Sequence, residues 1–97
     1  MAILPSEELD KRLVDMPGWN YKDDHICKEY ELNNFKDALE FVNKIGEAAE
    51  HMNHHPDILI HSWNKVQVSI STHSEHGVTE KDFILAKRIE RINNESR

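Results

Sequence analysis

The strongest hydrophobic pattern in the chain lies between residues 35 and 52. Apolar side chains recur there at spacings of three and four, which predicts a long amphipathic helix. We place on its apolar face Phe35, Ala38, Leu39, Val42, Ile45, Gly46, Ala49 and Met52, with Phe41 and Ala48 beside that face. Asn33-Asn34 offers a cap at its start. Gly46 lowers helix propensity but allows close approach of another element.

Short strands are indicated on both sides of this helix. Residues 25–32 alternate between apolar and polar side chains, and the turn-like Lys22-Asp23-Asp24 joins them to a preceding extended segment. After the helix, residues 57–63 are rich in strand-forming side chains and residues 66–70 alternate. This pattern predicts a second hairpin with Asn64-Lys65 as its turn.

Two further helices are predicted near the ends of the chain. The first begins at Ser6, whose hydroxyl can cap it, and stops at Pro17-Gly18. The last begins after Thr79, and Asp82 at its third position approximates a capping box. Asp82 also shares a face with the apolar residues of this helix. It is therefore either the cap partner of Thr79 or a group held toward an interior site.

The order of the predicted elements is αββαββα, with hairpins and no crossover pattern. We therefore expect an α+β fold of two layers, a four-stranded antiparallel sheet with three helices on one face. The chain has 97 residues, which is enough for one modest hydrophobic core. Residues 1–97 are accordingly interpreted as a single domain.

Composition and charge narrow the class of function. The net charge of −6 argues against a nucleic-acid surface, which needs clustered lysine and arginine. The lone cysteine, Cys27, cannot form an internal disulfide, which fits a reducing compartment. No apolar stretch approaches membrane-spanning length, and the start does not resemble a signal peptide. We expect a cytoplasmic protein without membrane or direct nucleic-acid partners.

The chain contains seven histidines, and three of them lie in residues 50–56, with the sequence Glu-His-Met-Asn-His-His-Pro. Pro56 disfavours helical geometry at His55, so the long helix is expected to end here. Histidine titrates near neutral pH, which suits proton transfer or metal binding. The alternative is a polar helix end whose imidazoles cap carbonyls and meet the helix dipole.

A two-layer fold could bring this helix end close to the end of the fourth strand and the start of the last helix. The groups that would then meet in one cleft are Glu50, His54, His55, His73 and Asp82. Imidazoles beside carboxylates can form a general acid–base site, because the carboxylate fixes the histidine tautomer. No nucleophile setting and no phosphate loop is present, so proton transfer on a small molecule is the chemistry that remains.

Metal binding is the alternative for the same histidines. His51-x-x-His54 and His73-x-x-His76 each place two imidazoles three residues apart. Neither spacing matches the helix of zinc peptidases, and cysteine ligands are absent. We therefore predict no metal, and leave His25, His61 and His76 as surface or strand residues.

Several separated motifs occur in a characteristic order. They are Gly18-Trp19, Glu50-x-x-x-His54-His55-Pro56, Trp63-Asn64-Lys65-Val66, Ser71-Thr72-His73 and Gly77-Val78-Thr79-Glu80-Lys81-Asp82. Together they resemble the pterin-4a-carbinolamine dehydratase family over most of the chain. The resemblance implies the fold expected above. It also implies dehydration of 4a-hydroxytetrahydrobiopterin to quinonoid dihydropterin, which recycles the pterin of aromatic amino-acid hydroxylases.

The resemblance also implies a role for individual residues. His54 and His73 match the acid–base histidines of the family, and His55 matches the one that chiefly holds the pterin. Contacts with the substrate fall on Asn53 and on the segment Ser71-Thr72-His73-Ser74. Glu50 and Asp82 match acidic positions that orient the imidazoles, while Pro56 turns the chain from helix into strand. No cofactor is implied.

The family also implies alternatives for partners. Its members form homodimers and homotetramers, so a homo-oligomer is expected. Animal members also serve as a dimerisation cofactor for a transcription factor. A module that binds a pterin or a protein without turnover is therefore the competing hypothesis for function.

Overall fold

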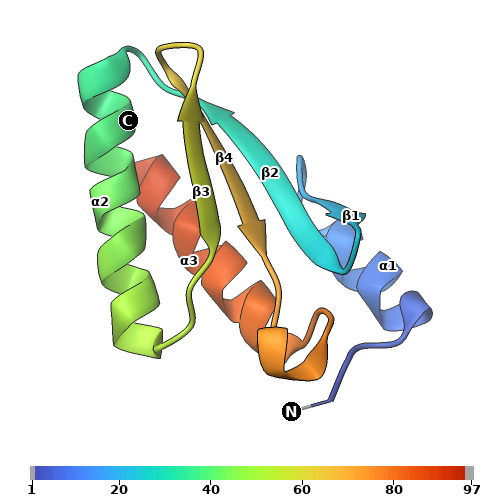
Figure 1. Ribbon diagram of the computed structural model, residues 1–97. Coiled ribbons are helices and arrows are strands. Elements are labelled where there is room, and N and C mark those ends of the chain that lie inside the picture. The colour runs from blue at the N-terminus through green and yellow to red at the C-terminus, as the bar shows by residue number, and fades with distance from the viewer. Residues whose placement is uncertain (1, 96–97) are drawn as a thin grey trace.

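The elements of the computed structural model, which describes residues 2–95, follow the predicted order (Figure 1). The helices are α1 (Ser6–Val14), α2 (Phe35–Met52) and α3 (Glu80–Glu95), and a short 3-10 helix, η1, spans His73–Glu75. The strands are β1 (Asn20–Lys22), β2 (His25–Glu31), β3 (Asp57–His61) and β4 (Lys65–Ile70). Positions 1 and 96–97 of the predicted domain lie outside the described residues.

The four strands form one antiparallel sheet in the order β1-β2-β4-β3. Figure 1 shows α2 and α3 side by side along the sheet, with α1 beside the β1–β2 hairpin. One face of the sheet and all three helices contribute to a single hydrophobic core. The sheet residues in that core are Ile26, Tyr30, Val66, Val68 and Ile70. This arrangement confirms the predicted two-layer α+β fold.

The bounds predicted for the long helix are confirmed, but its buried face differs from the predicted one. The Asn34 side chain accepts a hydrogen bond from the Asp37 N–H at 2.8 Å and so caps α2. The buried stripe consists of Ala38, Phe41, Ile45 and Ala49, whereas Phe35 and Leu39 are exposed. Within residues 2–95, no helix is long and apolar enough to cross a membrane.

Gly46 does not have the role that its place on the apolar pattern predicted. A Cβ added there would meet no atom within 4 Å, so no neighbouring element approaches the backbone closely. Glycine in a helix interior is destabilising because it loses more conformational freedom on folding than alanine.

Replacing Gly46 by alanine is therefore expected to raise the free energy of unfolding by about 0.5–1 kcal/mol. Urea unfolding of the two proteins measures the difference. Gly77→Ala is the comparison, because its Cβ would lie 3.1 Å from the end of the Ile3 side chain and the residue lies outside a helix, so it should not give the gain expected at Gly46. A Gly46→Ala protein less stable than wild type would contradict this account of α2.

Two local predictions are wrong, namely the cap of the first helix and the position of the turn in the second hairpin. Helix α1 begins at Ser6, but its N-cap is Pro5 and no side-chain cap bond forms. The second hairpin turns at residues 62–64 and not at Asn64-Lys65, because Lys65 already pairs with His61 in the sheet. Asn64 is held at the start of β4 by its side chain, which donates to the Leu32 carbonyl at 2.8 Å.

A polar network joins β2 to α3 at the edge of the core. The Lys28 Nζ lies 2.8 and 3.0 Å from the two carboxylate oxygens of Glu90. The Tyr30 hydroxyl donates to the Glu90 Oε2 at 2.5 Å. Burial, reinforced by this hydrogen bond to a carboxylate, raises the pKa of Tyr30 above its usual value of about 10.

This shift predicts a loss of stability at alkaline pH. The folded protein keeps the Tyr30 proton to a higher pH than the unfolded chain does. The contribution of the protonated Tyr30 to the free energy of unfolding is therefore complete below about pH 10. Above that pH it falls by up to about 1.4 kcal/mol per pH unit. Tyr30→Phe should remove this fall, although it also loses the bond to Glu90. Urea unfolding at about pH 9 and about pH 11 compares the two proteins, and an unchanged pH dependence in Tyr30→Phe would contradict the assignment.

Candidate active site

The end of α2 places the two adjacent histidines in different surroundings. Asn53 follows the helix in the left-handed conformation, with φ 51° and ψ 45°, and its N–H bonds the Glu50 carbonyl at 3.1 Å. The His54 N–H bonds the Ala49 carbonyl at 3.0 Å, so the carbonyls of Ala49 and Glu50 near the helix end are satisfied. This reversal buries His54, whereas the His55 side chain remains 56% exposed.

His54 is held by a buried carboxylate from α3. Its Nε2 lies 2.5 Å from the Oδ1 of Asp82, a residue with no exposed surface. The other carboxylate oxygen, Oδ2, accepts hydrogen bonds from the Thr72 hydroxyl at 2.9 Å and from the Thr79 N–H at 2.8 Å. Asp82 therefore joins the end of α2, the segment after β4 and the start of α3.

The two predicted alternatives for Asp82 are both present in the structure. Its Oδ2 is the acidic half of a capping box, because it accepts the N–H of Thr79, the residue before α3. The Thr79 hydroxyl lies 3.3 Å from the Lys81 N–H, which donates to it. Meanwhile Oδ1 faces His54. The capping interaction thus fixes the carboxylate that orients the imidazole.

The second carboxylate pair lies nearer to solvent. The Nε2 of His55 contacts the Oε2 of Glu50, five residues earlier in the chain. Both side chains are largely exposed, so solvent screens this pair much more than the buried His54–Asp82 pair. The contact fixes the direction of the His55 ring without burying it.

His73 reaches the same region from the segment that follows β4. Strand β4 ends at Ile70, and the chain continues through Ser71 and Thr72 into the 3-10 helix that His73 begins. The Thr72 N–H bonds the Gly77 carbonyl at 2.8 Å, which closes the loop that carries His73. His73 therefore lies just beyond the end of β4.

These segments surround an open cleft of about 500 Å³. Its lining includes all the residues that were predicted to contact a substrate, namely Asn53, His54, His55, Ser71, Thr72, His73 and Ser74. Pro56 also lines it, at the point where the chain enters β3. Glu50 and Asp82 are not part of the lining. Asp82 lies buried behind His54, and Glu50 contacts His55 from outside the cleft.

Three charged residues of the cleft were not predicted from the sequence. Asp57, Glu75 and Lys81 line it together with the histidines. Each directly follows or precedes a predicted site residue, namely Pro56, Ser74 or Asp82. Being next to a predicted site residue was the one sign in the sequence that these residues line the cleft. It does not distinguish a side chain that lines the cleft from one that points away.

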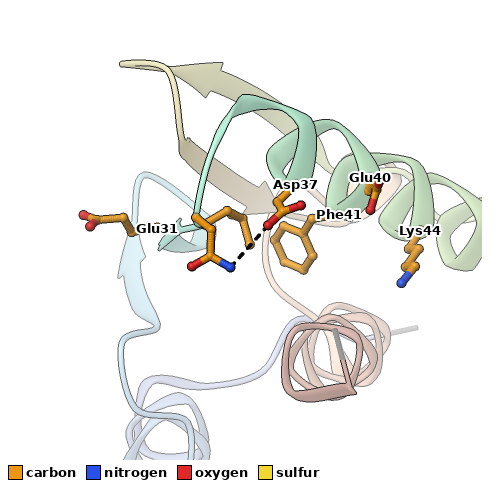
Figure 2. Close-up of a pocket in the computed structure, with 7 residues that line it drawn as sticks. Glu31, Asp37, Glu40, Phe41 and Lys44 are labelled. Carbon is orange, nitrogen blue, oxygen red and sulfur yellow. Dashed lines mark hydrogen bonds between the residues drawn. The ribbon is translucent and has the colours of Figure 1, made fainter. Parts of the chain in front are cut away.

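A second hollow, of about 300 Å³, lies at the other end of α2, where β2 leads into the helix (Figure 2). Figure 2 shows the Phe41 ring between Asp37 and Lys44, with Glu31 pointing away from them. The Asn33 side chain donates to the Asp37 carboxylate at 3.2 Å. Among the described residues, none that lines this pocket is a histidine. The acid–base groups therefore belong to the cleft at the opposite end of the helix.

The arrangement around His54 determines what its ring can do. A carboxylate can only accept hydrogen bonds, so the Nε2 of His54 carries the proton that Asp82 accepts. A neutral His54 then has its lone pair on Nδ1, the nitrogen left to take a proton from a ligand. Across residues 2–95, no group of three or more His, Cys, Asp or Glu side chains is arranged to hold a metal ion.

Comparison with known proteins identifies the family. The family model described as pterin 4 alpha carbinolamine dehydratase matches residues 2–92. The chain belongs to the pterin-4-alpha-carbinolamine dehydratase family. A family member of that name from Herpetosiphon aurantiacus is 49% identical over 92 residues, which cover 95% of each chain. Another from Sulfolobus acidocaldarius is 45% identical over 89 residues, covering 92% of this chain and 97% of the relative.

Two solved structures share the fold. A protein from Brucella melitensis described as a transcriptional coactivator/pterin dehydratase has a TM-score of 0.87 and 32% identity, covering 93% of this chain and 97% of its own. A pterin dehydratase-like protein described as a RuBisCO assembly factor in the alpha-carboxysome has a TM-score of 0.63 and 15% identity. It covers 76% of this chain and 84% of its own, and at this identity it shows the fold alone.

Proposed function

We propose that this chain, as one unit over residues 1–97, dehydrates 4a-hydroxytetrahydrobiopterin to quinonoid dihydropterin and water. The reaction would recycle the pterin used by aromatic amino-acid hydroxylases. The observation that carries the proposal is the His54–Asp82 pair, at 2.5 Å, in a cleft that His73 also lines. Membership of a pterin dehydratase family supports the choice of substrate.

The chemistry requires two proton transfers. The carbinolamine loses the hydroxyl on C4a as water and the proton on the neighbouring ring nitrogen. In our proposal the His54 Nδ1 accepts the nitrogen proton, while Asp82 keeps the proton on Nε2 in place. His73, at the exposed side of the cleft, donates a proton to the leaving hydroxyl. Exchange with solvent then returns both histidines to their starting states, so no cofactor is consumed.

The remaining residues of the cleft bind and orient the pterin in this proposal. His55, held by Glu50, supports the ring from the side opposite to the buried floor. Asn53 and the segment 71–74 offer backbone groups to the amide edge of the pterin. Such fixed positioning raises the rate because the reacting groups need no reorganisation when the hydroxyl leaves.

The test is the rate at which the purified protein dehydrates synthetic 4a-hydroxytetrahydropterin. We expect a rate proportional to protein concentration and well above that in buffer alone. The His54→Ala/His73→Ala double variant should return the rate to the buffer background. A wild-type protein that gives only the background rate would refute the proposal.

The competing function is a pterin- or protein-binding module without turnover. The name of the Brucella melitensis protein, which joins coactivator and pterin dehydratase, motivates this alternative. Calorimetric titration with a dihydropterin distinguishes the two. Binding that survives loss of both His54 and His73, in a wild-type protein without turnover, would favour the module.

A homodimer or homotetramer is also part of the proposal. Exposed apolar side chains on α2, Phe35 and Leu39, support a contact between copies, because both lie one helical turn apart on its outer side. Light scattering coupled to size-exclusion chromatography should give at least twice the monomer mass. A monomer at all accessible concentrations would exclude it.

A further inference from the structure

A fourth imidazole lies beside the proposed site and belongs to none of the family-like motifs. His25, the first residue of β2, has its ring centroid 6.4 Å from that of His73, with the ring planes at 76°. This is an edge-to-face arrangement, within the range of about 4.5–7 Å at which ring pairs attract. No sequence pattern connects these two residues, which are 48 positions apart.

The position of His25 is fixed by the turn that precedes it. Asp23 and Asp24 both have positive φ, 50° and 65°, and form a two-residue turn between Lys22 and His25. The His25 Nδ1–H donates to the Asp23 carbonyl at 2.8 Å, so the ring is tied to its own turn. Its Nε2 lies 4.0 Å from a carboxylate oxygen of Asp57, one of the residues that line the cleft.

His73 is less firmly held than the other histidine of the proposed chemistry. It is exposed and begins a 3-10 helix of three residues, whereas His54 is buried against Asp82. Within residues 2–95, its ring forms no hydrogen bond, and the His25 ring is the aromatic group that it meets. An exposed side chain without such a contact samples several rotamers, and only some of these direct its ring into the cleft.

We propose that His25 is a positioning residue for His73, which it holds by edge-to-face packing in the rotamer that faces the cleft. The hydrogen bond to the Asp23 carbonyl ties the His25 ring to the β1–β2 hairpin, so this hairpin determines the orientation of an otherwise exposed side chain. This inference rests on the proposed function only for its effect on turnover. The structural effect on His73 is independent of it.

The kinetic test compares two variants that keep different parts of His25. His25→Asn keeps a donor for the Asp23 carbonyl but loses the ring, whereas His25→Phe keeps a ring but loses both nitrogens. We expect His25→Asn to lower kcat about tenfold with KM changed less than about twofold, since a misoriented group affects the chemical step. His25→Phe should restore most of the lost kcat. His61→Ala, on the outer face of the sheet, is the control and should match wild type.

A second measurement does not depend on turnover. Three-bond NMR couplings report the χ1 rotamer of His73, which should be single in wild type and in His25→Phe but averaged in His25→Asn. Equal couplings in all three proteins would overturn the proposal, as would wild-type kcat in His25→Asn. If wild type shows no turnover, the proposed function fails, and the couplings alone decide whether His25 positions His73.

Discussion

Replacing His54 by alanine is expected to lower kcat for pterin dehydration by about 10²- to 10³-fold, as loss of a general base does. The variant also leaves the Asp82 carboxylate buried without its imidazole partner, so it should be less stable by about 2–3 kcal/mol. Steady-state kinetics with 4a-hydroxytetrahydropterin measure the first effect, and urea unfolding measures the second. The rate must be taken under conditions in which the variant is still folded.

His61→Ala is a matched control for this experiment. Like His54, His61 has its Nε2 2.5 Å from a carboxylate oxygen, here that of Glu29, but it lies at the end of β3 and away from the cleft. This variant should retain the wild-type kcat. A His54→Ala protein that is folded and as active as His61→Ala would remove His54 from the mechanism.

Replacing Asp82 by asparagine is expected to lower kcat by about 10²-fold or more, because it changes the tautomer of His54. Two donors, the Thr72 hydroxyl and the Thr79 N–H, face the Oδ2 position and hold the amide oxygen there. The amide nitrogen then faces His54 and donates to its Nε2. The ring proton moves to Nδ1, which can no longer accept a proton from the substrate.

Two further variants separate this effect from a loss of stability. Asp82→Ala leaves the buried Thr72 hydroxyl and Thr79 N–H without acceptors, so it should lose about 3 kcal/mol, well beyond the loss in Asp82→Asn. Glu50→Gln alters the exposed carboxylate beside His55 and should change kcat less than about threefold. If Asp82→Asn is as active as Glu50→Gln, the tautomer account is wrong.

The sequence was sufficient to predict the fold because each element carried its own local signal. The helix begins and ends in the structure where the sequence pattern predicted, at residues 35 and 52, because Asn34 caps its start and Pro56 follows its end. Alternation in residues 25–32 and 66–70 identified the strands whose inner faces now pack against the helices. Because short hairpin turns join these strands in pairs, an antiparallel sheet was the simplest arrangement.

Details that depend on contacts between elements could not be predicted in the same way. Apolar residues cover so much of α2 that more than one face of the helix could be the buried one. The position of the sheet decides that the face containing Phe41 is buried. Likewise, the pattern left two roles open for Asp82. The structure contains both, because its two oxygens face different elements. His25 carried no signal at all, since its contact with His73 arises from strand pairing across β2 and β4.

The most direct test of the account is a crystal structure of the protein with an unreactive dihydropterin. We expect the ring in the cleft between residues 53–55 and 71–74, with its C4a edge within hydrogen-bonding reach of the His54 Nδ1 and the His73 ring. The amide edge should meet backbone groups of these two segments. A pterin bound in the hollow near Phe41, or in the cleft with C4a turned away from both histidines, would contradict the account.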